Sequence, residues 1–61
     1  MYKFDNYTAV GIAEGFIEAE SDEQVIAAWQ YIYDTSLYQS LQGVFGRTVQ
    51  ALLEQGVIKQ D

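Results

Sequence analysis

The 61-residue chain contains no cysteine, no histidine and no proline. A chain of this length buries only about 60% of the surface that its unfolded form exposes, so domains of this size usually need a disulfide, a metal ion or a partner subunit. Without cysteine and histidine, the first two supports are missing. We therefore expect a single domain, residues 1–61, that contacts another protein chain, and we expect a homo-oligomer.

Positive charge is also scarce. Lys3, Arg47 and Lys59 stand against nine acidic residues, which gives a net charge of −6. A surface of this charge repels phosphate backbones, so we expect no direct binding to nucleic acid. No apolar run approaches the ~20 residues that cross a bilayer, and Met1 is not followed by a basic segment and an apolar stretch. We expect a cytoplasmic protein without membrane contact.

The same absences bear on catalysis. Histidine is the common general base and cysteine the best nucleophile, so only carboxylates remain for chemistry. Paired carboxylates act across a substrate cleft, and a domain of this size has no room for one beside its core. The glycines of residues 42–47 lack the Lys-Ser/Thr ending of a phosphate-binding loop. We expect no enzyme and no cofactor.

Apolar residues make up 49% of the chain, which predicts a folded domain. Ser21 and Gln24 have the spacing of a capping box, in which the serine hydroxyl accepts a hydrogen bond from the third amide of a helix and the glutamine reaches back. This spacing predicts a helix over 22–34. Its apolar side chains recur at helical spacing at Val25, Ile26, Trp29, Ile32 and Tyr33.

A second capping-box spacing at Ser36 and Gln39 predicts a helix over 37–55. Its apolar stripe consists of Leu37, Leu41, Val44, Phe45, Val49, Leu52 and Leu53, with Thr48 among them. Gly56 follows the last apolar residue, where a left-handed residue commonly ends a helix, and Val57 would then fold back near Leu52.

The first twenty residues are harder to interpret. Ala9, Ile12, Ala13, Phe16 and Ile17 predict a helix over 7–19, although two interior glycines would each cost roughly 1 kcal/mol. An alternative is a short strand over 2–4, whose partner strand would belong to another subunit. Several tyrosines lie at element ends or off the stripes, at Tyr2, Tyr7, Tyr31 and Tyr38, which favours a homodimer. The fold class is therefore all-α, a small three-helix domain completed by homodimerisation.

Two surfaces are candidates for binding. Gly43, Gly46 and Arg47 fall away from the apolar stripe, beside Gln39 and Gln50. The glycines indicate a kink between two shorter helices or a close crossing of another helix, from this chain or from a second copy. Arg47 would lie at the edge of that contact, and an ion pair with Asp34 or Glu54 is its more ordinary role.

The other candidate is an acidic face, which comprises Glu14, Glu18, Glu20, Asp22 and Glu23. A calcium loop needs alternating oxygen ligands around a glycine turn, and di-metal bundles need histidines, so we expect no metal site there. Asp22 and Glu23 favour the N-terminus of the helix over 22–34. We interpret the rest as a solvated surface or as a docking surface for a basic partner.

The motif Leu41-Gln42-Gly43-x-Phe45-Gly46-Arg47-Thr48, with further residues from Trp29 to Gly56, resembles a family of short uncharacterised proteins of tailed phages. The resemblance covers about residues 22–57. This chain departs from the family at Ser36, where glycine is usual, and at Gln39 and Ser40, where Trp-Gln is usual. The resemblance implies a phage origin, in the host cytoplasm, and no known activity.

Three functions follow as hypotheses. The first is a non-enzymatic accessory protein that acts by protein–protein interaction with an unidentified partner. The second is an acidic mimic of nucleic acid that inhibits an enzyme with a basic groove, although five of the nine acidic residues are compressed into 14–23. The third is a small structural component of a larger assembly.

Overall fold

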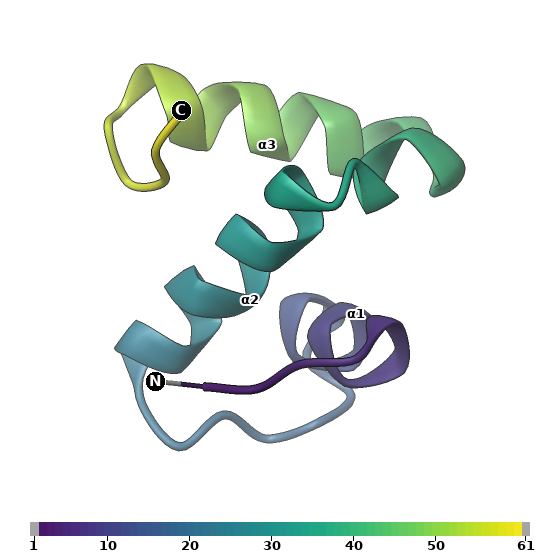
Figure 1. The fold of residues 1–61 in the computed structure, drawn as a ribbon, viewed down its shortest axis with the longest axis vertical. Helices are drawn as coiled ribbons and strands as arrows, with labels where there is room; N and C mark the ends of the chain where they lie inside the picture. Colours follow the sequence, from purple (N-terminus) through teal and green to yellow (C-terminus); the bar gives the residue numbers. More distant parts are fainter. Residues whose placement is uncertain (1, 61) are drawn as a thin grey trace.

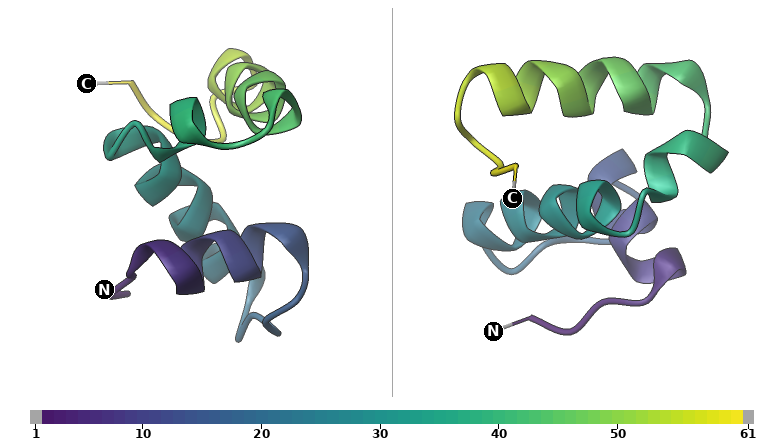
Figure 2. Two further views of the ribbon diagram at one scale, coloured as in Figure 1. Left: turned by 90° about the vertical axis from the view of Figure 1, so that its right-hand side faces the viewer. Right: turned by 45° about the horizontal axis from the view of Figure 1, so that its top comes forward.

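Three α-helices and one short 3-10 helix make up the regular structure of residues 2–60, the residues that this computed structural model describes. They are α1 (Asn6–Glu14), α2 (Asp22–Asp34), η1 (Leu37–Ser40) and α3 (Gly43–Glu54). Helix α2 lies in the middle, with α1 on one side and α3 on the other (Figure 1), and Figure 2 shows the C-terminal segment returning from α3 toward α2. The predicted all-α, three-helix fold is confirmed.

Helix α1 begins at an aspartate cap and ends five residues earlier than predicted. The Asp5 carboxylate accepts a hydrogen bond from the Thr8 amide at 2.7 Å, and this bond, with a further one from the Thr8 side chain, lowers the pKa of Asp5. Gly15 adopts a left-handed conformation with φ 85°, and the Phe16 amide donates to the Gly11 carbonyl at 2.8 Å. The chain reverses there because this is the Schellman arrangement. The predicted helix over 7–19 is therefore wrong beyond Glu14.

The alternative of a strand over 2–4 is not seen, since the structure contains no strand within residues 2–60, and pairing with another subunit stays a hypothesis. Phe4 is half-buried, and its ring packs against the ring of Tyr31 on α2 with the two centroids 5.8 Å apart. The Tyr31 hydroxyl donates to the Asn6 side-chain oxygen at 2.7 Å. This segment is therefore held by its side chains on α2, and Tyr31 is occupied by intramolecular contacts.

Helix α2 has the predicted bounds. The Ser21 hydroxyl accepts from the Gln24 amide at 3.2 Å, as the capping box requires. The Gln24 side chain reaches back one residue further than expected and accepts from the Glu20 amide. After Asp34 the chain turns at Ser36, whose φ of 59° is left-handed. Glycine would adopt that conformation without steric cost, whereas serine carries a Cβ atom that opposes it.

The predicted continuous helix over 37–55 is divided into η1 and α3. Ser36 makes no side-chain capping bond, and Leu41 is extended with φ −105° and ψ 177°. Helix α3 then begins at Gly43, so Gly43 and Gly46 lie in its first turn, where a weak helix former is least costly. The expected kink is thus a complete break between two helices.

The predicted end of α3 is confirmed. Gly56 has φ 75°, its amide donates to the Leu53 carbonyl at 3.1 Å, and the Val57 amide donates to the Leu52 carbonyl at 2.9 Å. These two bonds define a Schellman motif. Farther along, the Gln30 side chain accepts from the Lys59 amide and donates to the Lys59 carbonyl, both at 2.8 Å, which fastens the C-terminal segment to α2.

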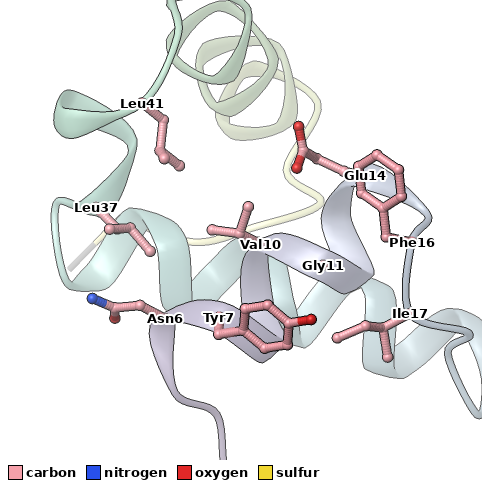
Figure 3. A pocket seen from close by; sticks show the side chains of 9 residues that line it. All are labelled: Asn6, Tyr7, Val10, Gly11, Glu14, Phe16, Ile17, Leu37 and Leu41. Atoms are coloured by element: carbon pink, nitrogen blue, oxygen red, sulfur yellow. The ribbon is translucent and has the colours of Figure 1, made fainter.

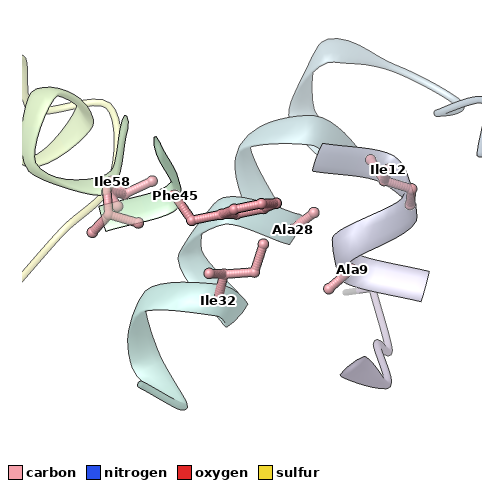
Figure 4. Packing of buried hydrophobic residues seen from close by; sticks show 7 residues of the cluster. Ala9, Ile12, Ala28, Ile32, Phe45 and Ile58 are labelled. Atoms are coloured by element: carbon pink, nitrogen blue, oxygen red, sulfur yellow. The ribbon is translucent and has the colours of Figure 1, made fainter. Parts of the chain in front are cut away.

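The core lies on both sides of α2 (Figure 4) and consists of Ala9, Ile12, Ala28, Ile32, Phe45, Val49 and Ile58. Ala9 and Ala28 are fully buried, and their small side chains let α1 approach α2 closely. On the other side, the ring centroids of Phe45 and Trp29 lie 5.6 Å apart. Three residues that the sequence placed on core stripes, Phe16, Ile26 and Val44, are exposed.

A candidate interaction surface on helix α1

The described surface contains an apolar groove of about 430 Å³ along α1. We call it the α1 groove, and its lining residues are Asn6, Tyr7, Val10, Gly11, Glu14, Phe16, Ile17, Leu37 and Leu41. Tyr7 is 80% exposed and Phe16 is 83% exposed, so two large apolar side chains face solvent at this site. Figure 3 shows Leu37 and Leu41 on one side of the groove and Glu14 and Phe16 on the other, with Val10 between them.

Helix α1 supplies the floor and one wall. Tyr7, Val10 and Glu14 are spaced by three and four residues, which places them on one face of the helix. Val10 is half-buried, whereas Tyr7 and Glu14 are exposed. Asn6 holds the start of this wall through its bond to the Tyr31 hydroxyl. The face thus offers an apolar centre with a carboxylate at its C-terminal end.

The turn at Gly15 builds the end of the groove. A Cβ atom on Gly11 would lie 2.5 Å from Cδ1 of Ile17, so glycine at this position lets Ile17 fold over α1 without moving its side chain. In a Schellman motif the residue after the left-handed glycine usually packs on the residue five positions earlier. Here that pair is Phe16 and Gly11, and because Gly11 has no side chain, Phe16 has no partner to pack on and stays exposed.

The second wall comes from the break that divides η1 from α3. Leu37 is the first residue of η1, and Leu41 is the extended residue that follows it. Both side chains are half-buried and face α1 across the groove (Figure 3). A continuous helix over 37–55 would not turn after Ser40. The wall therefore exists because the predicted helix is broken.

The predicted acidic face is spread over three neighbouring segments. Glu14 ends α1, Glu18 and Glu20 lie in the connection to α2, and Asp22 and Glu23 form the first turn of α2. All five side chains are exposed. Among residues 2–60, no group of three or more carboxylates is placed to hold a metal ion. Glu14 is the member of this face that also lines the α1 groove.

The predicted glycine surface has a different character. A Cβ atom on Gly43 would meet nothing within 4 Å, and one on Gly46 would meet Tyr38 at an ordinary 4.0 Å. Within residues 2–60 no helix crosses closely at either glycine, so that part of the hypothesis is wrong, and a crossing by a second copy stays a prediction. Gln39 on η1 and Arg47 and Gln50 on α3 are exposed.

The two carboxylates expected to pair with Arg47 have other partners in the described residues. Asp34 accepts a hydrogen bond from the Gln30 side chain at 2.9 Å, and Glu54 accepts a long one from Gln50 at 3.4 Å. The predicted ion pair of Arg47 is replaced by these helical pairs, in which the partners lie four residues apart.

A smaller hollow of about 270 Å³ lies at the end of α2, beside Tyr33, Asp34, Ser36, Tyr38 and Gln60. The rings of Tyr33 and Tyr38 stack there with centroids 6.0 Å apart. No polar or charged side chain of the described residues is buried, so this hollow contains no desolvated group that could act on a ligand.

Sequence reasoning missed the α1 groove because it placed Phe16 and Ile17 on the buried stripe of a longer helix. Gly15 carried the signal, since glycine after a helical run is the usual left-handed C-terminal residue.

Comparison with known protein families, with curated proteins and with solved structures finds no match in any of the three. In the described part of the chain, no helix has the length and apolar character needed to span a membrane.

Proposed function

We propose that this protein is a non-enzymatic accessory protein that binds another protein through the α1 groove. One observation carries the proposal. Tyr7 and Phe16 are 80% and 83% exposed at an apolar groove, although the buried core of the described residues is small. Leaving a phenylalanine exposed forgoes roughly 1.5–3 kcal/mol of burial. A partner that covers the groove recovers this free energy on binding.

The residue types of the groove support binding to a protein. Tyrosine and phenylalanine offer large, rigid contact areas and lose little conformational entropy on binding, and aromatic residues are enriched at protein interfaces. Sites for small ligands bury most of the ligand and aim a small number of precisely placed polar groups at it. In the α1 groove the polar side chains of Asn6, Tyr7 and Glu14 are all exposed, and the Asn6 side-chain oxygen already accepts from the Tyr31 hydroxyl.

The chemistry of the groove supports a role without catalysis. The titratable groups that line it are the Tyr7 phenol and the Glu14 carboxylate, both exposed. Catalytic acids and bases usually lie in clefts that exclude water, and these two exposed groups have no such surroundings. On the basis of the resemblance to short tailed-phage proteins, we also propose that the protein comes from a phage and acts in the host cytoplasm.

Site-resolved photo-cross-linking tests this function. We would place p-benzoylphenylalanine at Tyr7 or Phe16, with Gln39 replaced to sample the glycine surface and exposed Gln55 replaced as the control. After irradiation in cells that naturally contain the protein, we expect specific adducts from positions 7 and 16 and none from position 55. Adducts from position 39 alone would move the interface to the glycine surface. An absence of adducts at every position would contradict the proposed function.

A further inference from the structure

The walls of the α1 groove select the kind of element that fits it. An added β-strand needs a sheet edge with free backbone groups, and residues 2–60 contain no strand. The groove is instead formed by side chains of α1 on one side and by Leu37 and Leu41 on the other. Such a groove accepts the apolar face of an amphipathic helix, whose anchor side chains recur every three or four residues.

The charge around the groove selects the polar face of that helix. Glu14 lines the groove, and Glu18 and Glu20 follow Phe16 and Ile17 in the adjoining connection. The groove-lining residues include no cation, and the whole chain has a net charge of −6. The field at the groove is therefore negative, and it attracts and orients a positively charged partner.

A second copy of this chain does not meet these requirements. In a two-fold dimer the groove would face its own copy, so one acidic surface would meet another, and like charges across an interface are costly. Nor does the chain contain a basic helix to insert elsewhere. Among residues 2–60, the cation that lies within an α-helix is Arg47, while Lys3 and Lys59 lie outside the helices.

We infer that the α1 groove binds an amphipathic α-helix with a lysine- or arginine-rich polar face, supplied by a different protein. This inference rests on the proposed function and names the chemistry of its partner. Phe16 and Tyr7 cover the apolar face of the bound helix, and Glu14 and Glu18 lie toward its basic edge.

Designed peptides test the inference without knowledge of the natural partner. Two helical peptides share leucines at helical spacing, one with lysine and one with glutamate at every polar position. A third has the composition of the lysine peptide with its leucines shuffled. We expect the leucine/lysine peptide to shift the backbone amide resonances of the groove residues and to bind at least about tenfold more tightly than either of the other peptides.

Matched variants separate groove binding from general attraction between opposite charges. Phe16→Ser removes an exposed groove side chain, and Val44→Ser removes an exposed apolar side chain outside the groove. We expect Phe16→Ser to weaken binding of the leucine/lysine peptide about tenfold and Val44→Ser to leave it unchanged. Glu14→Gln reduces the preference for lysine over glutamate, whereas Glu54→Gln, distant in sequence and outside the groove, leaves it unchanged.

The outcomes distinguish failure of the inference from failure of the function. If the glutamate peptide binds as well as the lysine peptide, or if no peptide shifts the groove, the inference is overturned, and cross-links from position 16 still support the proposed function. If sedimentation equilibrium shows a dimer that Phe16→Ser dissociates, the groove belongs to a second copy and the inference is likewise overturned. If positions 7 and 16 form no cross-links, the function fails whatever the peptides do.

Discussion

Gly11 shows how the absence of one side chain organises the candidate site. Its position would accommodate a Cβ atom only if Ile17, whose Cδ1 would lie 2.5 Å away, moved. Ile17 in turn forms the end of the α1 groove, and Phe16 beside it is exposed because Gly11 offers no surface to pack on. A residue that weakens the helix in isolation is thus required by the turn that follows it.

We predict that Gly11→Ala destabilises the protein by about 1 kcal/mol, because the clash with Ile17 costs more than the helix gains from alanine. In the background of Ile17→Ala the same change should stabilise the protein by roughly 0.5–1 kcal/mol, since the clash is gone. Urea denaturation of the four proteins in this double-mutant cycle measures the difference. An equal effect of Gly11→Ala in both backgrounds would show that Ile17 does not restrict this position.

Asp5 predicts a pH dependence of stability. The hydrogen bonds from Thr8 stabilise the ionised carboxylate and lower its pKa in the native protein, so the unfolded chain binds the proton more readily. The stabilisation is complete above the unfolded pKa, at about pH 4, and is lost as the pH falls through the lowered native pKa.

The variant Asp5→Asn isolates this effect, because asparagine also caps helices well and does not titrate. Thermal denaturation of both proteins from neutral pH to strong acid gives their difference in stability. We expect the stability of the wild type relative to Asp5→Asn to decrease as the pH falls below about 4. A difference that stays constant with pH would mean that Asp5 ionisation contributes nothing to stability.

At the scale of the elements, the helix ends decide where each segment points. Both α1 and α3 end in a Schellman motif at a glycine with positive φ, Gly15 and Gly56. The first motif directs Phe16 into solvent, and the second directs Val57 and Ile58 toward the core. The difference lies in the residue five positions earlier in the chain. For Phe16 this residue is Gly11, which has no side chain, and for Val57 it is Leu52.

Gly43, the first residue of α3, and Gly56, two residues after its end, should respond oppositely to substitution by alanine. Gly43→Ala should stabilise the protein by about 0.4–1 kcal/mol, because its Cβ would enter open space at the start of a helix. Gly56→Ala should destabilise it by about 1–2 kcal/mol, because φ is 75° and alanine is strained there. Chemical denaturation measures both. If Gly43→Ala destabilises the protein instead, a contact with a second copy at that glycine becomes the better explanation.

At the scale of the whole molecule, apolar material is divided between a small core and the groove, and charge is strongly one-sided. The core contains two alanines and two isoleucines on α1 and α2, and its one buried aromatic side chain among the described residues is Phe45. Nine acidic residues against three basic ones add self-repulsion to this small core. A basic partner with an apolar face would cover the exposed apolar groove and reduce the repulsion between the acidic residues.

We predict that salt has opposite effects on the free protein and on its complex. Raising the ionic strength from low salt to about 1 M shortens the screening length to about 3 Å, which relieves repulsion and should raise the Tm of the free protein. The same salt should weaken binding of the leucine/lysine peptide. Calorimetry measures both, and Glu18→Gln with Glu20→Gln should reduce both slopes. A Tm that is independent of salt would contradict the role given to net charge.

The sequence by itself determined the features that depend on contacts between near neighbours. The start of α2 and the Schellman end of α3 follow from Ser21, Gln24 and Gly56, because caps use hydrogen bonds between residues three to five positions apart. The all-α class follows from helical spacing of the apolar residues. None of these features requires knowledge of how the helices pack.

Only the tertiary structure decided which apolar residues are buried and where the predicted helix over 37–55 breaks. Phe16, Ile26 and Val44 match core residues in type and spacing, but the arrangement of the helices leaves their side chains exposed. The α1 groove joins residues 6–17 to Leu37 and Leu41. It depends on the packing of segments distant in the chain, which local propensity does not determine, because packing free energy is summed over the whole molecule.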